Sequence, residues 1–156
     1  MRLYTAVFLI APIVGNGVAL AIILSGRVFS EETLAGFYWI AFFSAIAALI
    51  SLIAFLRKDI DLELAMLGSA VQAVLLILIF AAVYQDVGLM DGPDPVHPSF
   101  QTSLYFSIVT WTTLGYGDLH PPRALQLVAA AEALLGYLFS GILIGLLVAR
   151  LEAART

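Results

Sequence analysis

The feature that most constrains this chain is a series of four long apolar segments separated by polar connections, at residues 3–25, 33–56, 62–84 and 124–151. About 20 helical residues cross the hydrocarbon core of a bilayer, so each segment is long enough to span it. The chain is 62% hydrophobic and only 12% charged, which is too apolar for a soluble domain of this length. The sequence therefore predicts an all-α, multi-pass membrane protein with four transmembrane helices per chain.

The first apolar segment has one alternative interpretation. Ala19-Leu20-Ala21 is similar to a signal-peptide cleavage site, and cleavage there would remove this span. However, the apolar run continues past that site, and the residues before the run contain a single arginine, Arg2. A retained transmembrane helix is therefore the preferred interpretation.

The connection between the third and fourth segments contains a further helix that is too short to span. Residues 85–98 are dense in Asp, Gly and Pro and are predicted to form a loop. Ser99 is a suitable N-cap for a short helix that runs to about Thr112. Irregular backbone at membrane depth survives only where protein or a water-filled cavity covers it. The segment is therefore expected to be re-entrant, with the negative end of its dipole directed toward a pore axis.

A glycine-containing motif, Thr112-Thr113-Leu114-Gly115-Tyr116-Gly117-Asp118, follows this helix directly. A pore that strips water from a cation needs a ladder of backbone carbonyls, which requires dihedrals that alternate between ordinary and left-handed regions. Alternate glycines allow this because glycine adopts left-handed dihedrals without steric cost. We expect the cation to be bound by the Thr113 hydroxyl and by the carbonyls of Thr113, Leu114, Gly115 and Tyr116. Since one chain supplies one strand, a closed pore needs a cyclic homo-oligomer.

The motif resembles the T-x-G-Y-G-D selectivity filter of tetrameric potassium channels, and the similarity extends over about residues 64–151. The resemblance implies a homotetramer that conducts K⁺ passively through a filter made of Thr113, Leu114, Gly115, Tyr116 and Gly117. It further implies a pore domain over residues 62–156, with an outer and an inner helix, and two peripheral helices within residues 1–61. Permeant K⁺ is then the ligand, with no other cofactor and no enzymatic activity.

Several residues are expected to support this filter. Tyr105 stands where related channels use an indole to hold the filter aspartate, so its hydroxyl could reach Asp118. Val109 stands where some relatives carry a supporting glutamate, so that support is absent here. Glu132 lies inside an apolar segment and resembles a glutamate of bacterial inward-rectifier-like channels; a buried ionisable residue there needs a partner. The expected donors to Glu132 are Ser107, Thr110 and Thr112, and the alternative is a protonated glutamate bonded only to a backbone carbonyl.

The last apolar segment would form the inner helix. Gly136 stands at the position of a hinge glycine that is common in the inner helices of these channels. Ser140, Ile144 and Val148 follow at steps of four residues, so they share one helix face that could line the cavity. The alternative is that this face packs against a neighbouring helix.

The distribution of charges predicts an orientation. With both termini cytoplasmic, five of the seven Lys and Arg residues lie on the inner side of the cell inner (plasma) membrane. The pore loop then enters from outside, and the outer mouth carries His120 and the acidic residues Asp86, Asp91, Asp94 and Asp118. The expected partners are lipid, K⁺ and further copies of the chain. Nucleic acid is not expected, because the net charge is −4 and no basic patch exists.

Other functions remain as alternatives. The motif also contains the G-x-G-D signature of intramembrane aspartyl proteases, but such an enzyme needs a second aspartate in the membrane, and the others lie in polar connections. An ordinary glycine turn is a further alternative. A weakly selective cation channel and a non-conducting accessory subunit complete the set. The first two segments lack the regular arginines of a voltage sensor.

Overall fold

The computed structural model describes residues 13–17, 62–153 and 155. Residues 13–17 are helical, and the rest of the two predicted spans at residues 3–25 and 33–56 lies outside the described part. The possible cleavage site at Ala19-Leu20-Ala21 also lies outside it. The prediction of four transmembrane helices is therefore observed for the second pair only.

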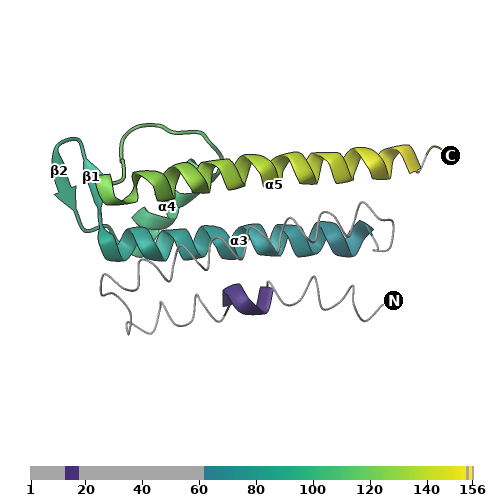
Figure 1. The fold of residues 1–156 in the computed structure, drawn as a ribbon, viewed down its shortest axis with the longest axis horizontal. Coiled ribbons are helices and arrows are strands. Elements are labelled where there is room, and N and C mark those ends of the chain that lie inside the picture. Colours follow the sequence, from purple (N-terminus) through teal and green to yellow (C-terminus); the bar gives the residue numbers. More distant parts are fainter. Residues whose placement is uncertain (1–12, 18–61, 154, 156) are drawn as a thin grey trace.

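Three helices make up most of the described chain: α3 (Leu62–Val87), α4 (Phe100–Trp111) and α5 (Gln126–Ala153). A short 3-10 turn, η1 (Arg123–Leu125), leads into α5. The segments Met66–Val87 and Arg123–Glu152 are long and apolar enough to cross a membrane. Figure 1 shows α3 and α5 running side by side along the molecule, with the short α4 beside them near one end. This arrangement agrees with the predicted outer, re-entrant and inner helices.

The short helix α4 begins where the sequence predicts. Ser99 has extended backbone, and its Oγ accepts a hydrogen bond from the Thr102 amide at 3.2 Å. This bond satisfies one of the amides that the first turn of a helix leaves free. The helix ends at Trp111, where the backbone turns into the glycine-containing motif.

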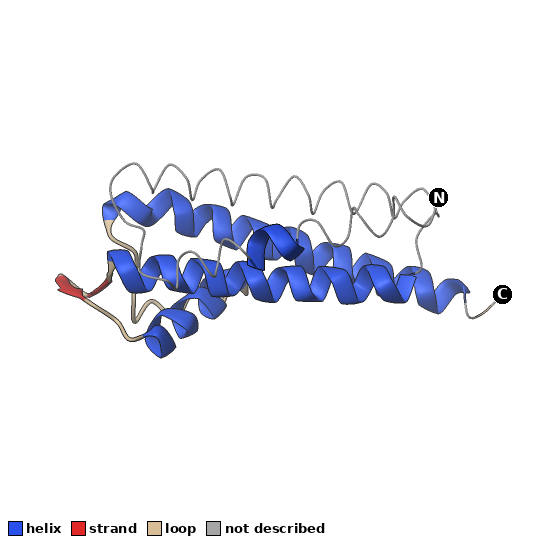
Figure 2. Cartoon of the chain, turned by 90° about the horizontal axis from the view of Figure 1, so that it is seen from below, coloured by secondary structure: helices blue, strands red, loops and turns tan. Residues whose placement is uncertain are grey.

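The connection between α3 and α4 differs from the prediction, because residues 85–98 are not all loop. They contain an antiparallel hairpin of β1 (Leu89–Asp91) and β2 (Asp94–Val96), at one end of the molecule (Figure 2). Leu89 is only 1% exposed and anchors the hairpin to the core. Strands of three residues are too short to show a clear alternation of polar and apolar residues, so the sequence pattern did not reveal them.

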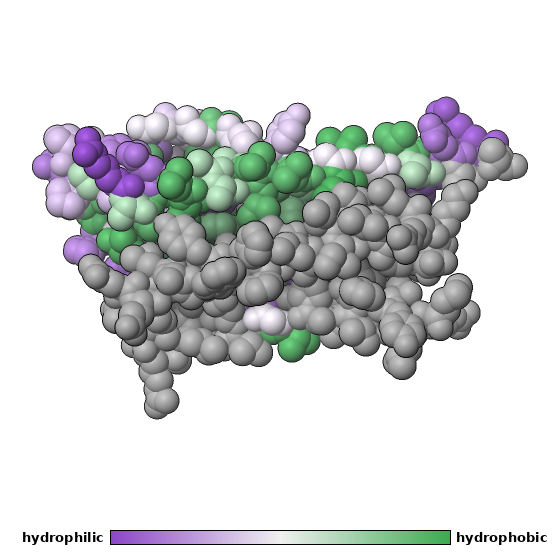
Figure 3. Space-filling view, in the orientation of Figure 1, coloured by the Kyte–Doolittle hydropathy of each residue, from purple (hydrophilic) through white to green (hydrophobic). Residues whose placement is uncertain are grey.

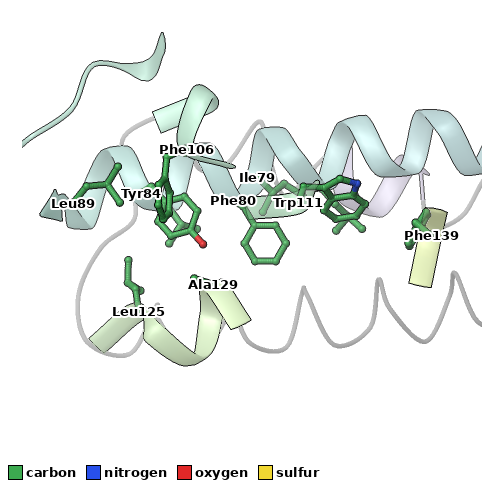
Figure 4. Close-up of a cluster of buried hydrophobic side chains, with 12 residues drawn as sticks. Ile79, Phe80, Tyr84, Leu89, Phe106, Trp111, Leu125, Ala129 and Phe139 are labelled. Carbon is green, nitrogen blue, oxygen red and sulfur yellow. The ribbon is translucent and has the colours of Figure 1, made fainter. Parts of the chain in front are cut away.

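A cluster of aromatic and aliphatic side chains joins the three helices near the hairpin end. Tyr84 and Phe106 meet edge to face, with ring centroids 4.8 Å apart, and Trp111 lies 5.5 Å from Phe139. Figure 4 shows Leu125 and Ala129 approaching Tyr84 from the opposite segment. In a bilayer, lipid is as apolar as these side chains, so close packing rather than exclusion of water holds such helices together.

The surface of the described part is apolar over most of its length. Figure 3 shows hydrophobic residues along the middle and hydrophilic residues gathered at the two ends. At one of these ends, Arg150 of α5 pairs with Glu63 of α3 at 2.5 Å, with both side chains largely exposed. Polar ends around an apolar middle are typical of a protein that crosses a bilayer.

Candidate functional site

The motif after α4, called the strand of residues 112–118 below, has no regular secondary structure, and its backbone alternates in φ. Thr113, Gly115 and Gly117 have positive φ angles of 57°, 55° and 79°, and no other residue from 112 to 118 does. At both glycines, an added Cβ would meet no atom of the described residues within 4 Å. The glycines are therefore required by the backbone conformation and not by lack of space.

Thr113 is the one described residue other than glycine with a positive φ. A left-handed backbone costs a residue with a Cβ roughly 1–2 kcal/mol. The sequence indicated left-handed backbone at the two glycines but not at Thr113. The alternation is therefore longer than the glycines alone predict, and it begins at the first residue of the expected filter.

The strand is tied back to the last turn of α4. The amides of Leu114 and Gly115 both donate to the Val109 carbonyl, at 3.0 and 3.4 Å. The Thr113 hydroxyl donates to the Thr112 carbonyl at 2.7 Å. Its single hydrogen is thereby used, so the lone pairs of this oxygen remain available to a cation.

The strand is open to its surroundings within one chain. All residues from 112 to 118 are exposed, and the large side chains Leu114 and Tyr116 are 57% and 67% exposed. An apolar side chain at membrane depth can face lipid. An irregular backbone at that depth must instead be covered by protein or line a water-filled cavity. The described part of the chain thus leaves the motif uncovered.

Tyr105 and Asp118 meet as the sequence predicts. The Tyr105 hydroxyl donates to Asp118 Oδ2 at 2.7 Å, and the Leu119 amide donates to Oδ1 at 3.0 Å. The hydrogen bond from Tyr105 holds the pKa of Asp118 below its usual value and raises the pKa of Tyr105 to about 12. The Tyr105 ring also stacks on Tyr116, with centroids 6.5 Å apart. One side chain of α4 thus contacts both ends of the sequence Tyr116-Gly117-Asp118.

His120 is exposed, as expected for the outer vestibule, but it is bonded to the hairpin. Its backbone exchanges two hydrogen bonds with Met90, at 2.9 and 3.0 Å. Its ring lies against the hairpin turn, where Nε2 donates to the Gly92 carbonyl at 2.8 Å. The position of His120 at an outer mouth stays a prediction, and the hairpin that holds its ring had not been predicted. The four aspartates that were predicted to surround an outer mouth, Asp86, Asp91, Asp94 and Asp118, are all exposed.

Glu132 is completely buried and contacts both other helices. Tyr84 Oη of α3 donates to Glu132 Oε2 at 2.7 Å, and Ser107 Oγ of α4 is hydrogen-bonded to Glu132 Oε1 at 2.5 Å. Of the three predicted partners, Ser107 is correct and Thr112 is wrong, since the Thr112 hydroxyl donates to the Ile108 carbonyl at 2.7 Å. The structure shows no bond from Thr110 to Glu132 either.

Tyr84 is the partner of Glu132 that sequence reasoning missed. Its only signal in the sequence was a phenol at the end of the third apolar segment, where an interfacial position was the ordinary interpretation.

Gly136 lies against the end of α4. A Cβ at this position would be 1.9 Å from the Trp111 carbonyl oxygen, so no larger residue fits without moving the helices apart. The predicted hinge at Gly136 stays a prediction. Further along α5, Ile144 and Val148 are 62% and 48% exposed, and Ser140 donates to the Gly136 carbonyl at 2.9 Å. The predicted cavity face is thus free of its own chain among the described residues.

Two long apolar helices, with a short helix and the strand of residues 112–118 between them, fit an all-α membrane protein. A family model described as "ion channel" matches residues 72–153, more than half of the chain. The chain therefore belongs to this ion-channel family. The matched region contains α4, the strand of residues 112–118 and all of α5. The comparisons with curated proteins and with solved structures gave no match.

Proposed function

We propose that this chain is the subunit of a homotetrameric, potassium-selective channel whose filter consists of residues 113–117. The observation that carries the proposal is the alternation of positive φ at Thr113, Gly115 and Gly117 directly after the short helix α4. Such an alternation turns successive carbonyls toward the same side, where they can replace the water around a cation. The left-handed Thr113 supports this assignment, because a strained non-glycine backbone is retained mostly at functional sites.

Selectivity and conduction follow from the same strand. The carbonyls of Thr113, Leu114, Gly115 and Tyr116, with the Thr113 hydroxyl, provide several adjacent sites for dehydrated K⁺. Ions in adjacent sites repel one another, so that binding is strong enough for entry and weak enough for exit. The α4 helix ends at this strand, and the negative end of its dipole favours a cation there.

Four copies complete the pore. One chain contributes one filter strand and leaves it uncovered, together with most of α5. Assembly around a four-fold axis would cover the filter backbone and place Ser140, Ile144 and Val148 around a central cavity. Closed cyclic symmetry is the usual solution for identical subunits that each supply one wall of a pore.

The same proposal fixes the orientation in the cell inner (plasma) membrane. The hairpin, His120 and the four aspartates lie on the outer side, and both termini lie in the cytoplasm, in agreement with the positive-inside rule. Clustered negative charge at the mouth raises the local concentration of cations. Tyr105 and Asp118 hold the outer end of the filter.

The test is the purified protein in liposomes. K⁺ flux separates a channel from a non-conducting accessory subunit, and the reversal potential under opposed K⁺ and Na⁺ gradients separates a potassium channel from a weakly selective one. Mass measurement in detergent gives the number of chains. A reversal potential that follows both ions equally would reject potassium selectivity, and conduction by a monomer or dimer would reject the tetramer.

A further inference from the structure

The junction of the three helices contains a small polar cluster in an otherwise apolar core. Tyr84 of α3, Ser107 of α4 and Glu132 of α5 are each 0% exposed. Three contacts link them: Tyr84 Oη to Glu132 Oε2 at 2.7 Å, Ser107 Oγ to Glu132 Oε1 at 2.5 Å, and Ser107 Oγ to the Ile77 carbonyl at 2.9 Å. All three distances are those of O–H···O hydrogen bonds.

Counting hydrogens decides the state of Glu132. A carbonyl can only accept, and an ionised carboxylate can only accept, whereas each hydroxyl carries one hydrogen. With Glu132 ionised, Tyr84 and Ser107 supply two hydrogens for three contacts. Ser107 Oγ would then lie between two acceptors with one hydrogen to share, and one buried contact would be repulsive.

One additional hydrogen, on Glu132 Oε1, satisfies every contact. Glu132 then donates to Ser107 Oγ, Ser107 donates to the Ile77 carbonyl, and Tyr84 donates to Glu132 Oε2. Placing the hydrogen on Oε2 instead leaves Ser107 with the same two acceptors. Among the described residues, no basic side chain forms an ion pair with Glu132 that would compensate a negative charge on it.

We propose that Glu132 is an un-ionised carboxylic acid at neutral pH and is the middle member of a one-way hydrogen-bond chain, Tyr84 to Glu132 to Ser107 to the Ile77 carbonyl. The chain crosses from α3 to α5 to α4 and back to α3. Tyr84, Glu132 and Ser107 are positioning residues that fix α4 against both long helices. This assignment stands on the hydrogen count, and only its consequence for the filter rests on the proposed function.

The consequence concerns where α4 ends. Ser107 lies one turn before Trp111, whose carbonyl is in contact with Gly136. The two contacts are four residues apart on α4, on the same side of the helix, and the filter strand begins immediately after them. The hydrogen-bond series thus fixes the rotation of α4 about its axis and its position along that axis. Residues 114 and 115 are bonded to this helix.

Infrared difference spectroscopy of the purified full-length protein at pH 7 tests the protonation state. Subtracting the Glu132→Gln spectrum from the wild type should reveal the C=O stretch of a carboxylic acid, lost in the variant. Glu152→Gln, at an exposed position of α5, is the matched control and should remove only a carboxylate signal. A difference spectrum for Glu132→Gln that contains only carboxylate bands would overturn the proposal. If that variant does not fold, ¹³C-labelled glutamate in the wild type must shift an acid band, or the proposal is wrong.

A second infrared measurement tests the direction of the hydrogen bonds in this series. In Tyr84→Phe, the acid C=O loses its donor, so its stretch should shift to higher wavenumber, whereas Tyr137→Phe on the exposed face should leave it in place. An unmoved band in Tyr84→Phe would show that the direction is wrong.

Glu132→Gln can still donate to Ser107 and accept from Tyr84, so it should retain K⁺ selectivity, and Glu132→Leu should lose stability as a tetramer. An acid band in a protein that does not conduct K⁺ would reject the proposed function and leave this inference standing.

Discussion

Gly136 of α5 and Trp111 of α4 are in backbone contact, and a single added Cβ at position 136 would lie 1.9 Å from the Trp111 carbonyl oxygen. Trp111 is the last residue of α4, so this contact sets the distance between α5 and the start of the proposed filter. A glycine at this position thus has a packing role that is present in the single chain, whether or not α5 also bends there.

We expect Gly136→Ala to destabilise each chain by about 1–3 kcal/mol, the usual cost of overpacking, and to disturb conduction through displacement of α4. Thermal unfolding of the tetramer and K⁺ flux are the measurements. Gly141→Ala is the control, since a Cβ there meets no atom of the described residues within 4 Å. Wild-type stability and flux in Gly136→Ala would show that the helices can separate without consequence.

Gly115→Ala should abolish the discrimination between K⁺ and Na⁺. Its φ of 55° is left-handed, so the new Cβ costs roughly 1–2 kcal/mol in each chain of the proposed tetramer. Gly92→Ala, with a φ of 56° in the hairpin, introduces the same strain away from the filter and should keep selectivity. The reversal potential decides between them. Unchanged selectivity in Gly115→Ala would mean that the filter lies elsewhere.

Tyr105→Phe should shorten channel openings without affecting folding. The phenylalanine keeps the ring that stacks on Tyr116 but removes the donor to Asp118. The outer end of the proposed filter then loses its hydrogen bond to α4 and keeps the ring contact. Single-channel recording gives the open durations, and Tyr137→Phe, at an exposed position of α5, is the control. Equal open durations in Tyr105→Phe and wild type would contradict a supporting role for this hydrogen bond.

His120→Ala should loosen the hairpin tip, because the Gly92 carbonyl loses its donor while the backbone pairing with Met90 remains. Hydrogen exchange should therefore accelerate at the turn between β1 and β2 and much less at Met90. His97→Ala is the control, as His97 is an exposed histidine just beyond β2. If exchange at the turn is the same in His120→Ala as in wild type, the ring contact does not stabilise the hairpin.

The described helices and the backbone of residues 112–118 were largely predictable, because both depend on local sequence. Apolar segments of bilayer length predict spanning helices wherever they occur. Ser99 predicts a helix start through a bond to an amide three residues away, and alternate glycines predict left-handed backbone at their own positions. The contact of Tyr105 with Asp118 followed from the resemblance to potassium channels. Residues 1–61, as a separate peripheral pair of helices, remain a prediction.

Only the tertiary structure decided which distant residues meet. Tyr84 and Glu132 are 48 residues apart, and His120 and Gly92 are 28 apart, with no local pattern linking either pair. Thr113 takes a left-handed backbone because the strand is tied to Val109 and continues an alternation set by its neighbours, against its own preference. The need for glycine at position 136 arises from a carbonyl that α4 brings against α5. Local propensity determined the described elements of this protein, and close packing of three helices determined the contacts that hold the strand of residues 112–118 in place.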